Sequence, residues 1–350
     1  MKKAERQFLV AGTLLLTVGL VQRAAAQQIE KTVKPGEQIY EIVYNDKDHS
    51  VYVASFGPMS KEIFESKQFR SRIYKLDADD LTVSDSIDVS SAPAFGLGIN
   101  RKTQTLYTSN TVSGSVSAID LATGEAIAEI TAPQGEAHTR EVVVDEATNT
   151  VYVTDPGEES RVWVIDGASN TLKTTIANTG NLTTGIALDQ KENVLYACNL
   201  GDNNIVEIDL KTHKVVKTFP AGGEKPTNLA YDPRGKRLFV SNQGTGNVSV
   251  LDAHSGKVIR TIPTGEGALG ISFNPKKKLL YIANRQAGTV TVVDTGNYAV
   301  LKNLKTGTHP NTVAIDVKSG NAYVTNKARS DRDNPSLKDP EGDTVSLISL

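Results

Sequence analysis

Cysteine is almost absent from this 350-residue sequence, in which Cys198 is the only one. One thiol cannot form a disulfide within the chain, nor can it supply a cysteine-rich metal site. The five histidines show neither a His-x-His nor a His-Glu-x-x-His spacing, so a zinc signature is missing as well. We therefore expect no metal and no cofactor, and we expect Cys198 to be a buried, unreactive side chain.

An excess of basic charge is also missing. The 38 Lys and Arg residues stand against 40 Asp and Glu residues, which gives a formal net charge of −2 at pH 7. Proteins held to nucleic acid by bulk charge normally show a clear basic excess. Apolar residues make up 39% of the chain and charged residues 22%, a balance that favours a packed core and argues against disorder.

The apolar run near the N-terminus is too short for a membrane span. It extends from Phe8 to Val21 and has 14 residues, whereas a helix needs about 20 to cross a bilayer. Lys2 and Lys3 precede this run and three alanines follow it at 24–26, which is the arrangement of a secretion signal. We predict a signal peptide over residues 1–26, with an uncleaved anchor as the alternative.

Removal of the signal peptide makes the protein more acidic. Cleavage after Ala26 takes away four basic residues and one acidic residue, so the net charge becomes −5. We expect the mature protein to be exported to the periplasm, soluble without stable membrane insertion, and monomeric.

What the sequence does contain is a repeat. Each copy has an aromatic residue followed by an apolar residue, a small residue and usually Asn, and most copies end in Asp after a further alternating run. The seven aromatic residues are Tyr52, Tyr107, Tyr152, Tyr196, Phe239, Tyr281 and Tyr323. From Tyr107 onward they are 45, 44, 43, 42 and 42 residues apart. Seven copies with so little drift predict a repeat architecture.

Each copy contains four short runs in which apolar and polar residues alternate. In the fifth copy these runs are 227–231, 238–241, 248–251 and 258–262, and each predicts a β-strand. A four-stranded sheet of about 40 residues cannot bury both of its faces alone, so such units stack around an axis. The sequence therefore predicts an all-β fold, a seven-bladed β-propeller with four-stranded antiparallel blades, in a single domain over 27–350.

The last copy lacks an outer strand, because residues 344–350 align with a third strand and the sequence stops there. Residues 29–36 are similar to the outer strand of the fifth copy at 258–265. We predict that residues 28–34 complete the seventh blade and close the ring, which removes exposed sheet edges.

Two polar residues recur at fixed places in the repeat. The repeated acids are Asp120, Asp166, Asp209, Asp252 and Asp294, and the repeated amides are Asn110, Asn199, Asn242, Asn284 and Asn326. Asp and Asn beside a turn accept hydrogen bonds from its N–H groups. We predict this structural role for both sets.

The channel mouth is the candidate site. Aligning the seven inner strands places two rings of side chains there. The first ring is Tyr40, Phe95, Arg140, Thr184, Thr227, Leu269 and Asn311, and the second is Glu41, Gly96, Glu141, Gly185, Asn228, Gly270 and Thr312. Aromatic, basic, acidic and amide groups in one pocket are typical of a site for a small molecule or a peptide. The simpler alternative is that these side chains are hydrated or pair with one another.

Two insertions fall in the same loop of adjacent blades, on the same face as the rings. They cover 56–71 and 327–343, and long loops of this kind are often functional. We expect them to form a flap beside the channel mouth.

The same face gathers basic and aromatic side chains. The basic ones are Arg140, Arg285, Lys327, Arg329 and Arg332, and the aromatic ones are Phe56, Phe64, Phe69 and Phe95. Single-stranded DNA binds to cations along a groove and stacks its bases on aromatic faces. Because the mature charge is −5 and acids such as Glu141 lie between the basic residues, we expect such binding to be weak and strongly salt-dependent.

The repeat Tyr323-Val324-Thr325-Asn326, with variants at 281–284 and 196–199, resembles the YVTN repeat family of bacterial and archaeal propellers. Similarity to one periplasmic member is closer and spans nearly the whole mature chain. The resemblance implies a periplasmic seven-bladed propeller without established catalytic activity. It also implies an ability to bind DNA, preferentially single-stranded.

We therefore predict a non-enzymatic binding or interaction propeller. Its expected partner on the channel-mouth face is single-stranded DNA, a peptide or a small ligand. The candidate binding residues are Tyr40, Glu41, Phe95, Arg140, Glu141, Thr184, Asn228, Arg285, His309, Asn311, Lys327 and Arg329. The alternative is a hydrolase of the lactonase type, whose metal ion would lie at the channel mouth among Glu41, Glu141, Asn228 and Asn311.

Overall fold

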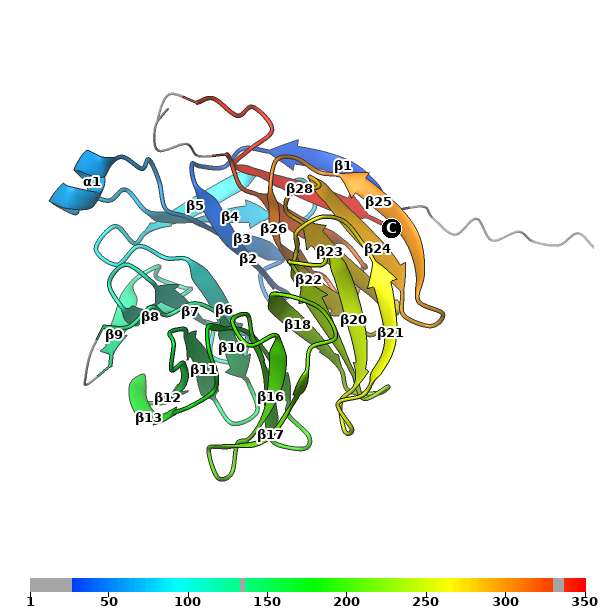
Figure 1. The fold of residues 1–350 in the computed structure, drawn as a ribbon. Helices are drawn as coiled ribbons and strands as arrows, with labels where there is room; N and C mark the ends of the chain where they lie inside the picture. The colour runs from blue at the N-terminus through cyan, green and yellow to red at the C-terminus, as the bar shows by residue number, and fades with distance from the viewer. Residues whose placement is uncertain (1–26, 133–135, 330–336) are drawn as a thin grey trace, which may run out of the picture.

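Seven four-stranded antiparallel sheets surround a central channel in the computed structural model (Figure 1), which describes residues 27–132, 136–329 and 337–350. The predicted signal peptide lies outside the described residues. In six of the sheets the four strands pair in chain order, from the inner strand at the channel to the outer strand at the rim. The chain is thus a seven-bladed β-propeller, as the repeat predicts.

Blades 1 to 4 follow one another along the chain. Blade 1 contains β2 (Ile39–Asn45), β3 (Ser50–Ser55), β4 (Arg72–Asp77) and β5 (Val83–Asp88). Blade 2 contains β6 (Gly96–Asn100), β7 (Thr105–Asn110), β8 (Ser115–Asp120) and β9 (Ala126–Thr131). Blade 3 contains β10 (Val142–Asp145), β11 (Thr150–Asp155), β12 (Arg161–Asp166) and β13 (Thr171–Ile176). Blade 4 contains β14 (Thr183–Asp189), β15 (Val194–Asn199), β16 (Asn204–Asp209) and β17 (Lys214–Pro220).

Blades 5 to 7 complete the ring. Blade 5 contains β18 (Pro226–Asp232), β19 (Arg237–Asn242), β20 (Asn247–Asp252) and β21 (Val258–Pro263). Blade 6 contains β22 (Ala268–Asn274), β23 (Leu279–Asn284), β24 (Thr289–Asp294) and β25 (Ala299–Lys305). Blade 7 contains β26 (Pro310–Ile315), β27 (Ala322–Asn326), β28 (Thr344–Ser349) and, as its outer strand, β1 (Gln28–Val33).

The hydrophobic core lies between the blades. Within the described residues it forms seven clusters, one at each contact between neighbouring blades. The cluster between blades 7 and 1, for example, joins Ile42 and Leu76 to Tyr323 and Leu347. All seven repeat aromatics are buried in such clusters. A single blade would leave both of its apolar faces in water, so the contact between blades stabilises the ring.

The strand β1 closes the ring. It pairs antiparallel with β28, and this places Gln28 opposite Ser349 and Val33 opposite Val345. The hydroxyl of Ser349 also donates a 2.6 Å hydrogen bond to Glu30. The predicted closure over residues 28–34 is confirmed, with the strand ending at Val33.

The repeated Asp residues accept turn N–H groups, as predicted. Oδ1 of Asp120 accepts those of Ala122 at 2.7 Å and Thr123 at 3.1 Å. Oδ1 of Asp209 likewise accepts the N–H groups of Lys211 and Thr212 in its own turn.

The prediction for the repeated Asn residues is wrong in its detail, because among the described residues none of their side chains accepts a turn N–H and all five donate through Nδ2. The Nδ2 group of Asn284 donates to the hydroxyls of Thr289 at 3.1 Å and Thr291 at 2.8 Å. Asn284 is the last residue of β23 and lies opposite Thr289, the first residue of β24. Its amide therefore joins the two strands directly instead of bonding to the turn between them.

The two insertions lie between the second and third strands of blades 1 and 7, as predicted. The first contains α1 (Lys61–Ser66), whose first turn is capped by Ser60, since its hydroxyl accepts the N–H of Ile63 at 3.2 Å. Figure 1 shows α1 projecting from the disc beside blade 1. Within the described ranges no helix has the length and apolar character needed to cross a membrane. In the second insertion, residues 330–336, which include Arg332, lie outside the described residues.

Candidate ligand-binding site at the channel mouth

The inner strands of all seven blades contribute to one pocket at the channel mouth, with a volume of about 80 Å³. Thirteen of the fourteen side chains predicted for the two rings line it, and Gly185 is the exception. The lining residues are Tyr40, Glu41, Phe95, Gly96, Arg140, Glu141, Thr184, Thr227, Asn228, Leu269, Gly270, Asn311 and Thr312. The alignment of inner strands thus places these residues correctly, because equivalent positions of a propeller meet around one axis.

Two aromatic rings form one wall of the pocket. Tyr40 of blade 1 and Phe95, just before β6 of blade 2, lie edge to face with their ring centroids 5.2 Å apart. The ring of Phe56, from the first insertion, lies 5.1 Å from that of Phe95. Phe64 stacks on Phe56 at 6.2 Å and is 43% exposed. Packed aromatic rings therefore connect the channel mouth to the surface of the first insertion, with Phe56 buried between Phe95 and Phe64.

Two cations lie against Tyr40. The guanidinium of Arg140 is 5.5 Å from the centre of the Tyr40 ring and donates a 2.7 Å hydrogen bond to its hydroxyl. The ammonium of Lys327, at the start of the second insertion, is 5.1 Å from the same ring centre. Cations at this distance are attracted by the negative face of the ring. The two insertions thus reach the pocket at neighbouring points, Phe56 at Phe95 and Lys327 at Tyr40.

A third cation completes a positively charged group. Arg285, which follows β23, donates a 2.7 Å hydrogen bond to the side-chain oxygen of Asn311. Within the described residues none of Arg140, Arg285 and Lys327 has a carboxylate within 4.0 Å. Burial, together with the charges of Arg285 and Arg140, lowers the pKa of Lys327 to about 8. A lowered lysine pKa means that the protein itself leaves the positive charge there poorly compensated.

Four of the predicted site residues lie beside the pocket rather than in its lining. They are Arg285, His309, Lys327 and Arg329. Burial and the charges of Arg285 and Arg329 lower the pKa of the His309 imidazole, so this side chain is neutral at pH 7. Arg329 is exposed, and its backbone N–H donates to Asp339 at 3.0 Å.

Two carboxyl groups, those of Glu41 and Glu141, line the same pocket as Arg140. Burial raises the pKa of Glu141 to about 7, although Arg140 and the amide of Asn228 favour its ionised form. The pKa of Glu41 is raised well above its ordinary value, first by burial and then by the charge of Glu141. The pair therefore carries less negative charge at neutral pH than two ordinary glutamates would.

The lactonase-type alternative requires these carboxyl groups to share an ion with Asn228 and Asn311. The amide of Asn311 is already used, since its oxygen accepts from Arg285 and its nitrogen donates to the Tyr40 carbonyl at 3.3 Å. The oxygen of Asn228 accepts the N–H of Leu229 at 2.8 Å. The described part of the chain contains no group of three or more His, Cys, Asp or Glu residues placed to hold a metal ion.

The small residue of the repeat has a role that the sequence reasoning missed. In several blades its hydroxyl donates to a first-ring carbonyl of the next blade. These bonds run from Ser109 to Arg140, from Thr154 to Thr184, from Ser241 to Leu269 and from Thr325 to Tyr40. In blade 4 the position is Cys198, which is buried as predicted. The signal was present in the sequence as Ser or Thr directly before the repeated Asn, or before Asp155 in blade 3. It explains how four of the first-ring residues are held by a neighbouring blade.

Glycine in the second ring also has a physical reason. A Cβ atom on Gly96 would lie 2.1 Å from the carbonyl oxygen of Arg140, and one on Gly270 would lie 2.2 Å from that of Asn311. Both distances are far shorter than a van der Waals contact. These positions therefore need glycine so that neighbouring inner strands can approach closely around the channel.

Fold and site together define a seven-bladed propeller with an aromatic and cationic channel mouth. The chain belongs to the YncE-like β-propeller family, whose model, described as "YNCE-like beta-propeller", matches residues 4–276. It is 35% identical over 218 residues to the "Uncharacterized protein YncE" of Escherichia coli (strain K12) and 34% identical over 218 residues to that of Salmonella typhi.

These alignments cover 60% of this chain and 59% of each relative. The match therefore spans about three fifths of the length of the curated relatives, which is less than the nearly complete coverage of the mature chain expected from the resemblance. The family resemblance itself is confirmed.

Proposed function

We propose that this protein is a non-enzymatic binding propeller whose channel mouth holds single-stranded DNA. A phosphate would lie among Arg140, Arg285 and Lys327, and the adjoining bases would stack on Tyr40 and Phe95. The observation that carries the proposal is the convergence of cations on the Tyr40 ring, with no carboxylate within 4.0 Å of them in the described part of the chain.

The chemistry of the pocket favours a single strand over a duplex. Each unstacked base offers a flat face, and stacking on an aromatic side chain contributes roughly 1–3 kcal/mol per base. The rings of Tyr40 and Phe95 line the pocket, and that of Phe64 is exposed on the first insertion, so these three offer such faces. In a duplex the bases stack on one another and cannot use these faces, so only the phosphates would be recognised.

The acidic net charge of the chain does not oppose this local site. Two carboxyl groups of the pocket, Glu41 and Glu141, have raised pKa values, which reduces their repulsion of a phosphate at neutral pH. Burial lowers the pKa of Lys327 to about 8, and the charge of Asp343 opposes this fall only in part. Lys327, whose pKa is lowered, would regain a full charge beside an anion. Bound phosphate and protonated lysine therefore favour each other.

The test compares a labelled 15-nucleotide single strand with its duplex by fluorescence anisotropy. The variants are Arg140→Ala and Arg285→Ala, and the control is Lys211→Ala, which removes an exposed charge from a third-to-fourth-strand turn on the opposite face. Each mouth variant should weaken single-strand binding about 5- to 20-fold and reduce its salt dependence, whereas Lys211→Ala should change little. Equal losses in all three variants, or equal affinity for the duplex, would contradict the proposal.

We also propose that the protein acts after export to the periplasm. The proposal is supported by the basic residues, short apolar run and alanines at 1–26. Cell fractionation and mass spectrometry of the recovered protein should give a chain that begins at Gln27. Recovery of the intact chain from the cytoplasm would contradict it.

A further inference from the structure

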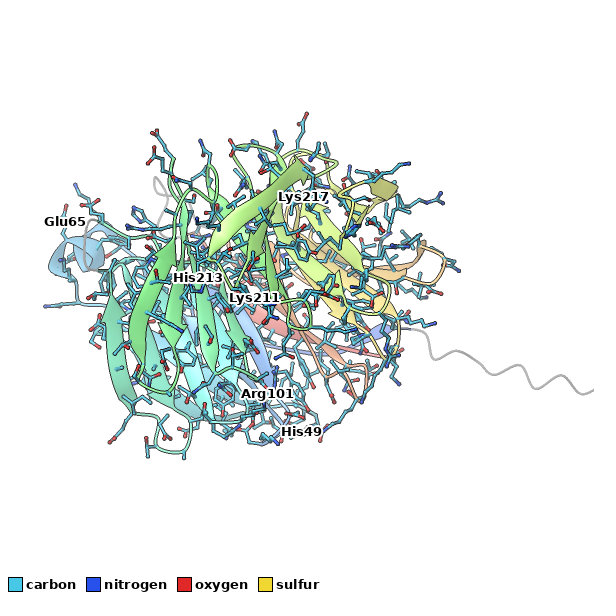
Figure 2. All side chains as sticks on the ribbon, turned by 90° about the horizontal axis from the view of Figure 1, so that it is seen from below. His49, Glu65, Arg101, Lys211, His213 and Lys217 are labelled. Carbon is cyan, nitrogen blue, oxygen red and sulfur yellow. The ribbon has the colours of Figure 1, made fainter. Side chains whose placement is uncertain are left out.

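A second cavity, of about 190 Å³, lies between blades 3 and 4. It opens among the turns that follow the inner strands, on the face opposite to the channel mouth. Figure 2 labels His213, which lines the cavity, next to Lys211 on the turn between β16 and β17, and apart from Glu65 of α1 at the left edge of the view. The lining residues that matter for its chemistry are Asp145, Tyr152, Lys173, Leu188, Gln190 and His213.

The cavity is lined by a leucine at a position where the next blade has a tyrosine. Between blades 4 and 5, Tyr231 fills this place and its hydroxyl donates to the carboxylate of Asp189. Between blades 3 and 4 the corresponding residues are Leu188 and Asp145. Leucine is shorter than tyrosine and has no hydroxyl, so the space that the Tyr231 ring occupies in one interface is left open in the other.

The carboxylate of Asp145 is already satisfied within the protein. One oxygen accepts the N–H of Ala147 at 2.9 Å and the side-chain amide of Gln190. The other accepts the hydroxyl of Thr148 at 2.7 Å. Asp145 is therefore a poor partner for a further donor. Although burial acts to raise its pKa, these hydrogen bonds lower the pKa on balance and keep the carboxylate ionised.

The hydroxyl of Tyr152, by contrast, has no hydrogen-bond partner among the described residues, although the side chain is only 4% exposed. Other repeat tyrosines use theirs: that of Tyr107 donates to Asn170 at 2.8 Å and that of Tyr281 to the Gly320 carbonyl at 3.1 Å. In the turn between the third and fourth strands of blade 4, the residue equivalent to Asn170 is His213. His213 lines the cavity and accepts no hydrogen bond from Tyr152. Within the described part of the chain, the Tyr152 hydroxyl is therefore a free donor in the wall of the cavity.

The remaining polar groups of the cavity are also donors. Lys173 forms no ion pair within 4.0 Å among the residues described, and an imidazole such as that of His213 offers an N–H group in either tautomer. Burial raises the pKa of Tyr152 to about 12, so its hydroxyl keeps its proton at neutral pH. Apolar side chains, with Leu188 and Leu210 among them, supply the rest of the wall.

We propose that this cavity binds a small organic carboxylate. Its charged group would accept hydrogen bonds from Tyr152, Lys173 and His213, and its short apolar part would pack against Leu188 and Leu210. A volume of about 190 Å³ exceeds the space of a single water many times over. The proposed site is independent of the channel mouth and does not rest on DNA binding.

The experiment titrates the purified protein, with histidine rings isotopically labelled, with acetate, butyrate, succinate and inorganic phosphate while NMR follows the His213 resonance. Leu188→Tyr copies the neighbouring interface and should fill the cavity, and Leu188→Met is its control of similar volume. Tyr152→Phe removes only the hydroxyl, and its control Tyr107→Phe removes a hydroxyl that already has a protein partner. Thermal unfolding of each variant checks that the fold is retained.

We expect at least one carboxylate to shift the His213 resonance saturably. Leu188→Tyr should weaken this binding at least about tenfold and Tyr152→Phe about 3- to 10-fold, with little change in the two controls. Arg140→Ala should leave it unchanged, which separates this site from the channel mouth. Absence of saturation for every carboxylate, binding of phosphate alone, or equal binding by Leu188→Tyr would overturn the proposal.

Discussion

The guanidinium of Arg140 donates a 2.7 Å hydrogen bond to the hydroxyl of Tyr40 across the mouth of the channel. Arg140 comes from blade 3 and Tyr40 from blade 1, so the bond passes over blade 2. It brings a cation and an aromatic face, which are 100 residues apart in the sequence, into one position. The proposed phosphate and base contacts both depend on this arrangement.

Replacing Tyr40 should separate its two roles. Tyr40→Phe keeps the ring but releases Arg140, so single-strand affinity should fall about 3-fold. Tyr40→Ala also removes the stacking face and should lower affinity about 10-fold or more. Tyr298→Phe, in a turn of blade 6, is the control. Fluorescence anisotropy measures all three, and equal affinities for Tyr40→Ala and the native protein would exclude Tyr40 from the site.

DNA affinity should decrease as the pH rises from 6 to 9. Glu141, with a pKa of about 7, gains a negative charge in this range, and Lys327, with a pKa of about 8, loses a positive one. Both changes disfavour a phosphate, so the total loss should be about 10-fold. The double variant Glu41→Gln, Glu141→Gln should retain only the decline near pH 8. Affinity that is constant or increases over this range would contradict the assignment.

Glu141 should also make the stability of the fold depend on pH. Its folded-state pKa is raised to about 7 from an ordinary value of 4.5, so the unfolded chain ionises first and stability falls as the pH rises from about 4.5 to 7. Glu141→Gln cannot ionise. Its free energy of unfolding should exceed that of the native protein by on the order of 2 kcal/mol at pH 8, with no such gain at pH 4. Guanidinium unfolding at both pH values measures the difference, and a gain at pH 4 as large as that at pH 8 would refute this account.

The closing strand should be essential for stability. Deletion of residues 27–33 exposes the edge of β28 and uncovers the clusters on either side of blade 7, so the midpoint of thermal unfolding should fall by more than about 5 °C. Ile29→Ser with Val33→Ser keeps the backbone pairing and should have a smaller effect. An unchanged midpoint after the deletion would show that β1 is dispensable.

Thr325 should contribute to stability through its hydroxyl alone. It donates to the Tyr40 carbonyl at 2.9 Å and joins the last blade to the first. Thr325→Val keeps the shape but loses this bond and the one that the hydroxyl accepts from the N–H of Thr312 at 3.2 Å, and should cost on the order of 2 kcal/mol. Thr325→Ser keeps the hydroxyl and should unfold at nearly the native denaturant concentration. If both variants lose the same stability, packing rather than the hydrogen bond is responsible.

The fold could be predicted from the sequence because the same pattern of strands and turns recurs in seven copies. Seven aromatic residues at nearly constant spacing define the blades, and the similarity of 29–36 to 258–265 locates the closing strand. The channel-mouth rings follow from the same alignment, since symmetry brings equivalent positions together.

The remaining features depend on residues that differ between the copies, and a consensus of the seven copies does not show these differences. The amide of Asn284 donates to two threonines of the next strand, a choice between donor and acceptor that spacing alone does not decide. The cavity between blades 3 and 4 is lined by Leu188 at a position where the next blade has a tyrosine. The pKa values of Glu141 and Lys327 depend on burial and on charges from distant blades, which the sequence does not display.

The pairing of β1 with β28 constrains the order in which the protein can fold during synthesis. Synthesis makes β1 first, but its partner is the last strand of the ring, more than 300 positions later. Six blades can form while the chain is being synthesised, but β1 and β28 can pair only after β28 has been made. Contacts between such distant segments form slowly, so the pairing of β1 with β28 should be a late step in folding. A product truncated before β28 would leave the ring open, with unpaired sheet edges.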